Sequence, residues 1–277
     1  MSLKEILENL KENQAILHYN VSTFEQIKAG VLAVKETNIP LIFGVSEGER
    51  NYLIPDLVKN IIDFFRENEN LPIFLNADHS KSLESGKLAI DLNYDAVLLD
   101  LSDLDLEENI KQTKTLIEHR GEKNILIEGE VGKIEGRSEI QKEIEVSEEN
   151  LTKIDDAIKY VSETGVDLLA VSIGNIHGIT SGSIKLDFER GAKIYRNVKI
   201  PLVLHGGSGI SMDDFKRCIE IGFKIIHINT EFRKIWKEKL AEELNKETVT
   251  PYKILDPVVE ALKEKIIYYQ KSFWGLL

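Results

Sequence analysis

The sequence predicts a (β/α)8 TIM barrel, a closed parallel sheet surrounded by helices. Eight short apolar runs alternate with segments of helical periodicity, and this alternation is typical of a parallel sheet. The runs are almost continuously apolar, as expected of strands that are covered on both sides. The length of 277 residues suits one such barrel, so we expect residues 1–277 to form a single domain. An open, doubly wound sheet is the main alternative, but no glycine-rich dinucleotide motif follows the first run.

The strands are expected at the apolar runs and the helices between them. The runs are 16–20, 41–46, 73–78, 96–100, 125–130, 168–174, 202–205 and 225–229. Helical periodicity is clear at 23–37, 56–68 and 155–165. An extra amphipathic helix is expected at the N-terminus, with Leu3, Ile6, Leu7 and Leu10 on one face, and another at 251–274. The charged stretch 131–150 is expected to be a long functional lid or a mobile connection.

Composition narrows the class of protein. The net charge of −12 disfavours nucleic acid and anionic membranes as partners. The single cysteine, Cys218, excludes a disulfide within the chain and favours a reducing compartment. No apolar run approaches the roughly 18 residues of a membrane-spanning helix. We therefore expect a cytoplasmic protein.

Polar side chains gather where the apolar runs end. They are Asn20, Ser46, Asp78, His79, Asp100, Glu128, Glu130, Asn175, His177, His205, His227 and Asn229. Chemistry in such barrels lies at the carboxyl ends of the strands, and buried polar groups are costly unless they are paired or used. One polar end carries little information, but eight at equivalent positions predict a shared site.

Three histidines in this set predict a metal site. His79, His177 and His205 each follow an expected strand in a polar context. Three protein ligands and one open position are typical of catalytic zinc. The alternative for any one of them is a hydrogen-bonded core histidine. His18, inside the first strand, and His119, near a helix end, are expected to be structural.

The run Gly206-Gly207-Ser208-Gly209 predicts a phosphate site. It follows the seventh strand and precedes a helix that Ser211 would cap, and amides at a helix N-terminus attract anions. Barrels commonly bind phosphate after strands seven and eight, and the eighth supplies Asn229 and Thr230. The alternative is that the glycines only form a tight turn.

A metal and a phosphate site on one rim imply a small phosphorylated substrate. The metal would polarise a carbonyl group, and a neighbouring carboxylate would move protons. Asp78 is adjacent to His79 and is the natural candidate for that carboxylate. Its alternative role is to orient a ligand imidazole.

These motifs resemble the class II, zinc-dependent fructose-bisphosphate/tagatose-bisphosphate aldolase family along most of the chain. The similar segments are YNVSTFE (19–25), VSEG (45–48), Asp78-His79, LLDLS (98–102), EENI (107–110), IEGEVG (127–132), GNIHG (174–178), LDFER (186–190), LVLHGGSG (202–209) and NTE (229–231). The pair GNIHG and HGGSG at this spacing is specific. The family fold is the barrel already expected from the strand pattern.

The resemblance implies a role for each matching residue. It implies His79, His177 and His205 as ligands of one catalytic zinc ion, with Glu130 and Asp100 near alternative metal positions and room for a monovalent cation. It implies Asp78 as the group that takes the substrate hydroxyl proton. The implied substrate and phosphate contacts are Asn20, Ser46, Gly178, Gly206, Gly207, Ser208, His227, Asn229 and Thr230. Relatives are commonly homodimers or homotetramers.

Three departures from the family pattern concern the aldehyde half of the site and one proton transfer. His227 replaces an asparagine, and its alternatives are a hydrogen bond to the substrate, metal binding or neither. Ser138 stands where the lid glutamate is usual, so Glu139 would have to shift one place to replace it. A basic residue that some relatives use for the distal phosphate falls near Asp256.

The expected activity is the zinc-dependent, reversible aldol cleavage of a ketose phosphate. By family frequency the default substrate is fructose 1,6-bisphosphate, and the products would be dihydroxyacetone phosphate and glyceraldehyde 3-phosphate. The alternatives are another aldehyde partner, as in tagatose bisphosphate, or a sugar-phosphate binding protein without activity. A zinc hydrolase on the same barrel is disfavoured because no His-x-His pair ends the first strand.

Overall fold

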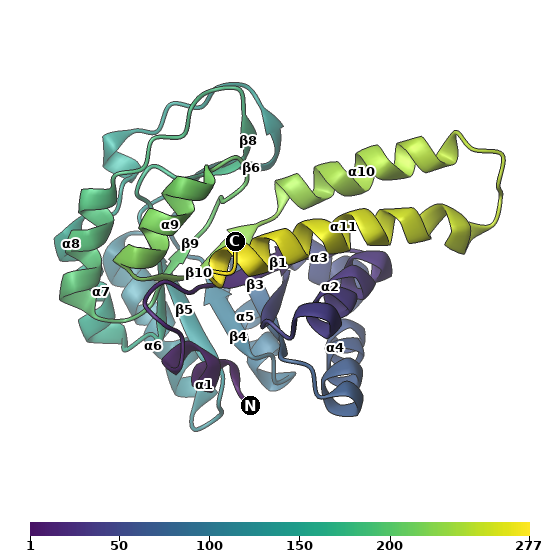
Figure 1. Cartoon of the computed structure of the whole chain (residues 1–277). Helices are drawn as coiled ribbons and strands as arrows, with labels where there is room; N and C mark the ends of the chain where they lie inside the picture. Colours follow the sequence, from purple (N-terminus) through teal and green to yellow (C-terminus); the bar gives the residue numbers. More distant parts are fainter.

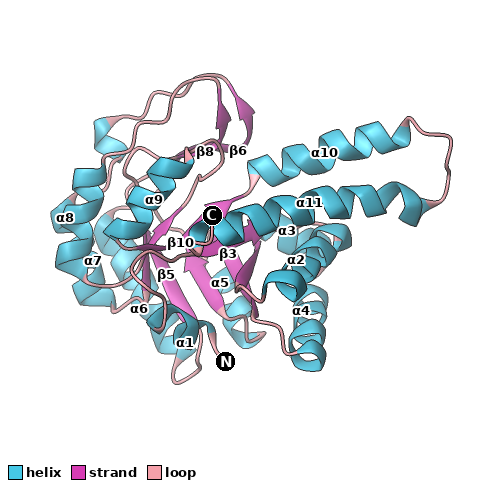
Figure 2. Ribbon diagram, in the orientation of Figure 1, coloured by secondary structure: helices cyan, strands magenta, loops and turns pink.

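The computed structural model describes residues 1–277, and eight parallel strands close into a barrel with helices around it (Figures 1 and 2). The barrel order is β1-β10-β9-β7-β5-β4-β3-β2. Its strands are β1 (Ile16–Asn20), β2 (Leu41–Val45), β3 (Ile73–Ser80), β4 (Ala96–Leu99), β5 (Leu126–Val131), β7 (Leu168–Val171), β9 (Leu202–Leu204) and β10 (Phe223–Ile228). The predicted (β/α)8 class is therefore confirmed.

Helices connect the strands and cover the outside of the barrel. They are α1 (Leu3–Glu8), α2 (Phe24–Thr37), α3 (Glu47–Leu53), α4 (Pro55–Glu69), α5 (Leu83–Asp91), α6 (Leu106–Arg120), α7 (Ile154–Thr164), α8 (Phe188–Val198), α9 (Met212–Ile221), α10 (Thr230–Leu244) and α11 (Pro251–Phe273). The predicted helices at both termini are present as α1 and α11. Ser211 caps α9, where its side chain accepts a hydrogen bond from the Asp214 amide.

The stretch 131–150 differs from the predicted loop. It contains strand β6 (Glu135–Gln141) and a short 3-10 helix at Glu148–Asn150. β6 pairs with β8 (Ile176–Thr180) in a two-stranded sheet separate from the barrel. The sixth barrel strand ends at Val171, so His177 lies in this small sheet rather than at a barrel strand end. The strand was not predicted because neither face of β6 is fully buried, so charged residues occur along it and no alternation of apolar and polar residues is visible.

The barrel interior has an apolar floor. Each strand contributes inward side chains at alternate positions, and those near the N-terminal ends form one cluster with Leu3 of α1. The cluster contains Leu3, Ile16, Ile42, Phe74, Ala96, Leu126, Leu168, Ala170, Val203 and Ile225. A second and larger core lies between the outer faces of the strands and the helices. The interior nearer the C-terminal strand ends is polar and holds the site.

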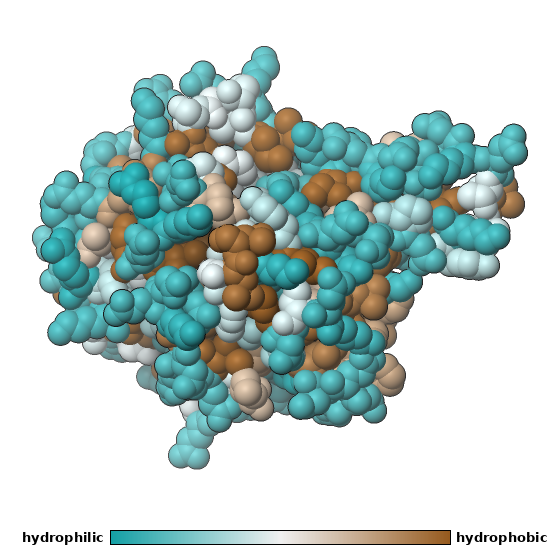
Figure 3. Space-filling model, in the orientation of Figure 1, coloured by the Kyte–Doolittle hydropathy of each residue, from teal (hydrophilic) through white to brown (hydrophobic).

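Helices α10 and α11 form an antiparallel hairpin that extends beyond the barrel (Figure 1). The base of α11 packs against β1 and α2, whereas the far end of the hairpin carries exposed apolar side chains at Leu244, Val249 and Tyr252. Figure 3 shows a mostly hydrophilic hairpin with small hydrophobic patches toward its far end. None of the helices combines the length and the apolar composition needed to span a bilayer.

Candidate active site

A polar pocket occupies the mouth of the barrel. Its lining consists only of polar residues and glycines: Asn20, Ser46, Asp78, His79, Ser138, His177, Gly178, His205, Gly206, Ser208, His227, Asn229, Thr230 and Arg233. The pocket holds about 190 Å³. Most of the residues predicted to form a site are therefore brought together. Of the predicted set, Asp100, Glu130, Gly207 and Glu139 lie outside this lining.

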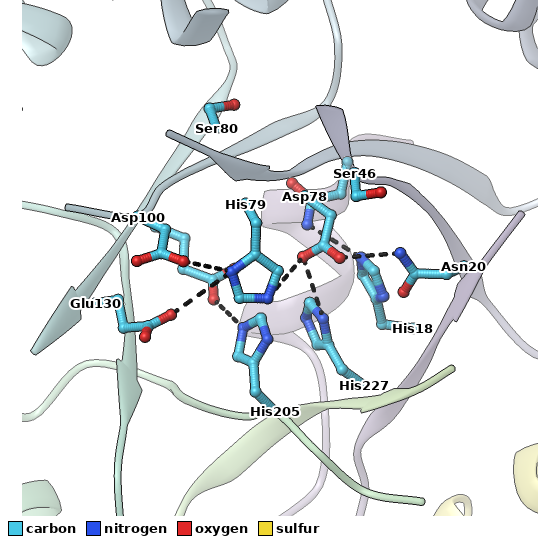
Figure 4. Close-up of polar contacts among 12 residues, drawn as sticks. His18, Asn20, Ser46, Asp78, His79, Ser80, Asp100, Glu130, His205 and His227 are labelled. Carbon is cyan, nitrogen blue, oxygen red and sulfur yellow. Dashed lines mark hydrogen bonds and ion pairs between the residues drawn. The ribbon is translucent and has the colours of Figure 1, made fainter. Parts of the chain in front are cut away.

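His79, His177 and His205 face one another in this pocket. Their ring centroids are 4.8 to 5.9 Å apart, and each offers a ring nitrogen within 4.8 Å of the others. His79 Nδ1 donates to Asp100 Oδ2 over 2.6 Å, and His205 Nε2 lies 2.9 Å from Glu128 Oε1 (Figure 4). Carboxylates that hold one nitrogen of a ring commonly orient the other toward a metal. The donor set fits zinc, which binds neutral imidazoles in such groups of three.

The backbone at His79 is strained in a way that aims its ring. Its φ of +43° lies in the left-handed region, which a residue with a Cβ seldom adopts. The buried guanidinium of Arg50 donates to the carbonyl oxygens of Val45 and Asp78, at 2.8 and 3.2 Å, and also to Ser80 Oγ at 3.1 Å. These bonds hold the end of β3 in place. Strain that is retained by surrounding contacts is typical of functional sites.

Asp78 is ionised despite its burial. Burial would raise the pKa of this carboxyl, but His79 and His227 outweigh it and hold the pKa well below its usual value. Asn20 Nδ2 donates to Asp78 Oδ2 over 2.9 Å and fixes the group against the pocket. A buried carboxylate that stays charged can accept a proton from a bound hydroxyl group.

An acidic pair lies behind His79, away from the pocket lining. Burial and Asp100 raise the pKa of Glu130 to about 8, whereas Asp100 is paired with His79 and with Lys81 Nζ at 2.5 Å. His79, Asp100 and Glu130 form a second group of closely spaced ligand atoms. These carboxylates therefore lie beside the three histidines, and their role toward a metal stays a prediction.

The glycine loop after β9 approaches other backbone closely. Gly206 has a φ of +66°, and a Cβ there would lie 2.2 Å from the Ile176 carbonyl oxygen. The Gly207 amide was expected to be open to a ligand, but it donates to the His227 carbonyl oxygen over 2.9 Å. The loop is thus a tight turn that also forms a wall of the pocket, and phosphate binding by its amides stays a prediction.

Two buried oxygens beside this loop have no hydrogen-bond partner. They are Asn229 Oδ1 and Thr230 Oγ1, at the start of α10. Ser208 Oγ accepts a hydrogen bond from the Glu231 amide over 3.1 Å and ties the loop to the same helix. Buried polar atoms are nearly always paired, so the unpaired Thr230 hydroxyl indicates a ligand position.

Arg233 is a pocket residue that sequence reasoning did not identify. Its Nη2 donates to Glu49 Oε1 over 2.7 Å, and its Nη1 donates to the Ser138 carbonyl oxygen over 3.0 Å. Glu49 also accepts hydrogen bonds from Asn20 and Ser46, so these groups form one wall. The sequence signal was available, because Arg233 follows Thr230 by one helical turn. Asp256, by contrast, is exposed and pairs with Lys28 outside the pocket.

His227 stands between two other imidazoles. Its ring stacks on His18 with centroids 3.4 Å apart and an interplanar angle of 8°, and it lies 3.8 Å from the centroid of His205. Nδ1 of His227 is 3.5 Å from Asp78 Oδ1, the contact drawn between them in Figure 4. This contact does not have the geometry of a hydrogen bond, and neither nitrogen has another partner. His18, expected to be structural, bonds to Asn76 and supports this stack from below the pocket.

The β6 segment places Ser138, not Glu139, in the pocket. The carbonyl oxygen of Ser138 is bound by Arg233, while the Glu139 side chain is exposed. The lid is therefore docked on the pocket wall with a neutral residue facing inward. His119 lies at the end of α6 and bonds to Asp91, far from these groups in the fold.

Comparisons with known proteins agree with this geometry. The family described as "Fructose-bisphosphate aldolase class-II" matches residues 1–274. The fructose-bisphosphate aldolase of Staphylococcus aureus strain Mu50 is 34% identical over 281 aligned residues, covering 99% of this chain and 96% of that protein. The fructose-bisphosphate aldolase of Geobacillus stearothermophilus is 33% identical, with coverage of 99% and 96%. The crystal structure of the YdjI aldolase from Escherichia coli K12 superposes with a TM-score of 0.84 at 27% identity, covering 99% and 97% of the two chains.

Proposed function

The chain belongs to the class II fructose-bisphosphate aldolase family and is a lyase, and from that premise we propose that it cleaves a ketose bisphosphate with one zinc ion as cofactor. The default substrate is fructose 1,6-bisphosphate, giving dihydroxyacetone phosphate and glyceraldehyde 3-phosphate. Tagatose bisphosphate, or another aldehyde partner, is the alternative. The observation that carries the proposal is the cluster of three imidazoles on the same pocket as the ionised Asp78.

His79, His177 and His205 would hold the metal. Zinc bound by three neutral imidazoles supplies a Lewis acid that polarises a carbonyl group. Asp100 and Glu128 orient two of these rings, and Glu130 lies within 3.9 Å of His79 Nδ1. A monovalent cation is a further cofactor that we propose from the family resemblance.

Asp78 would remove the proton from the C4 hydroxyl group as the C3–C4 bond breaks. Its charge at neutral pH and the hydrogen bond from Asn20 prepare it for that step. In the condensation direction the same carboxyl group returns the proton to oxygen. General base catalysis of this kind commonly contributes about 10²- to 10⁴-fold in rate.

The two ends of the pocket suit two phosphates. The 1-phosphate would lie against Gly178, Gly206, Ser208 and the unpaired hydroxyl of Thr230, with Asn229 completing the wall. Gly207 would support this wall from outside the lining, since its amide donates to the His227 carbonyl oxygen. At the other side, Ser46 and Arg233 share Glu49 and would face the distal phosphate. This guanidinium would supply the positive group that some relatives place near the position of Asp256.

Zinc dependence and the role of Asp78 can be tested together. Chelation should abolish cleavage of fructose 1,6-bisphosphate, and zinc should restore it. Asp78→Ala should lower kcat by about 10²-fold or more with a full zinc content. Triose phosphates are the products expected, and the same assay with tagatose bisphosphate assigns the C4 configuration. Cleavage at the wild-type rate after either change would contradict the proposed chemistry.

The distal phosphate contact has a matched control on the same helix. Arg233→Met should raise KM for the bisphosphate by about tenfold or more, because a charge-assisted contact is lost. Lys234→Met removes a neighbouring charge that pairs only loosely with Glu238, at 3.9 Å, and should leave KM unchanged. Equal effects of both variants would assign the change to general electrostatics.

A sugar-phosphate binding protein without activity is the second candidate. The observation that favours it is Ser138 facing the pocket where a lid acid would be useful. It predicts that dihydroxyacetone phosphate binds, as measured by calorimetry, while no ketose bisphosphate is cleaved.

We also propose that residues 1–277 act as one domain in the cytoplasm and assemble as a homodimer or homotetramer. The exposed apolar side chains at the end of the α10–α11 hairpin support association with a second copy. Light scattering at several concentrations tests the assembly.

A further inference from the structure

Aldol cleavage requires proton transfers at two different atoms. The O4–H bond loses its proton, and the electrons of the C3–C4 bond remain on C3. The aldehyde then leaves, and C3 must gain a proton to complete the hydroxymethyl ketone. Asp78 accounts for the transfer at oxygen, so the pocket needs a second group for the transfer at carbon.

Only one side chain in the pocket lining is a candidate for the proton transfer to carbon. Its titratable residues are Asp78, His79, His177, His205, His227 and Arg233. Three of the histidines are the proposed metal ligands, and an arginine remains charged in proteins. Glu139 is exposed outside the lining, and Ser138 faces the pocket in its place. His227 is the one side chain left that can carry a proton to carbon.

The setting of His227 suits a relay better than a structural role. His18 and His205 cover both faces of the His227 ring, so the ring can interact with other groups only through its edges, which carry the two nitrogens. Both nitrogens are buried and lack a hydrogen-bond partner. Nδ1 lies 3.5 Å from Asp78 Oδ1, an oxygen that also has no partner. A structural histidine buried to this degree would be expected to bond through at least one nitrogen.

We propose that His227 is a further catalytic residue, which passes the proton from Asp78 to the carbon atom. Asp78 takes the O4 proton and gives it to Nδ1, while the Nε2–H of the same neutral ring gives its proton to C3. Asp78 ends as a carboxylate and His227 as the other neutral tautomer, which exchange with water resets. No net proton is consumed. The inference rests on the proposed aldol reaction.

His227→Asn provides the test, because an amide keeps polarity but cannot relay a proton. The first measurement is the exchange of the hydroxymethyl hydrogen of dihydroxyacetone phosphate with deuterium oxide, followed by NMR. The second is bisphosphate cleavage in the presence of hexacyanoferrate(III), which oxidises the carbanion before it is protonated. We expect exchange to fall by about 100-fold in His227→Asn, while oxidant-assisted cleavage stays within about fivefold of wild type.

The outcomes separate the competing explanations. Exchange within about twofold of wild type in His227→Asn would overturn the proposal, as would an equal loss of both measurements, which indicates a structural role. Loss of exchange in Glu139→Gln but not in His227→Asn would assign the step to the lid. Zinc content and circular dichroism of each variant establish that it folds. If the wild type neither exchanges nor cleaves, the proposed function fails instead.

Discussion

At the scale of single residues, His79 is a proposed metal ligand that carries a proton when no metal is bound. Burial opposes the charged ring, but Asp78, the hydrogen bond to Asp100 and Glu130 outweigh it and raise the pKa of His79 to about 10. A metal binds the neutral imidazole, so zinc would have to displace this proton. The carboxylates that orient the ring would therefore also make zinc binding sensitive to pH.

Zinc binding to the metal-free protein should release about one proton from His79 at neutral pH. The free ring is protonated below its raised pKa, so the apparent affinity should increase about tenfold per pH unit between about pH 7 and 9. Calorimetry in two buffers of different ionisation enthalpy measures the proton released. An affinity that is independent of pH over this range would mean that His79 is neutral before the metal arrives.

Gly44 supports the site by leaving space for the His18 ring. A Cβ at Gly44 would lie 1.9 Å from Cε1 of the His18 ring. Gly44→Ala should therefore destabilise the fold by about 1–3 kcal/mol and displace the stacked histidines. Gly48→Ala is the matched control, since Gly48 is exposed in α3 with no atom near its would-be Cβ. Denaturant unfolding of both variants measures the difference, and equal stabilities would contradict this packing account.

At the scale of elements, strand periodicity explains which site residues were predictable. Side chains at i and i+2 share a face, so the pairs Asn76 with Asp78 and Glu128 with Glu130 enter the barrel together. The strands and their polar ends were therefore visible in the sequence. Arg233 was overlooked although it follows Thr230 by one helical turn, because its contact with the pocket wall depends on β6, and β6 has too few buried residues to give a strand pattern.

The α1 helix should contribute to stability without contributing to catalysis. Leu3 is 2% exposed and belongs to the apolar floor, at the opposite end of the barrel from the pocket. Leu3→Ala should cost about 2–5 kcal/mol of unfolding free energy while kcat and KM remain unchanged. Ile6→Ala, at a half-buried position on the same helix, should cost less. A change in KM with Leu3→Ala would show that floor and pocket are coupled.

At the scale of the whole molecule, the buried polar groups in the C-terminal half of the barrel lower the free energy of unfolding, and a bound metal should restore part of it. Zinc that binds only the folded chain stabilises it by about 2.7 kcal/mol at a free concentration of 100 times Kd. Thermal unfolding with and without zinc measures this effect. His177→Ala removes one proposed ligand and should abolish most of the shift. An equal shift in that variant would place the metal elsewhere.

The closed sheet itself was predictable, since eight strands with intervening helices leave few other arrangements. The pairing of β6 with β8 was not, because it joins residues 39 to 41 positions apart in two segments that are neither continuously apolar nor periodic. The same holds for the stack of His18 on His227, which joins the two ends of the chain where β1 and β10 close the barrel.

The α10–α11 hairpin also affects how the molecule moves through a solvent. A compact chain of this length would have a radius of gyration of about 19 Å, and an arm that stands away from the barrel increases that value and the frictional drag. A single protomer should thus sediment more slowly, and elute earlier from a gel-filtration column, than a sphere of 31.5 kDa. Calibration against globular standards would overstate its mass, so its stoichiometry has to be determined by a method that does not depend on shape.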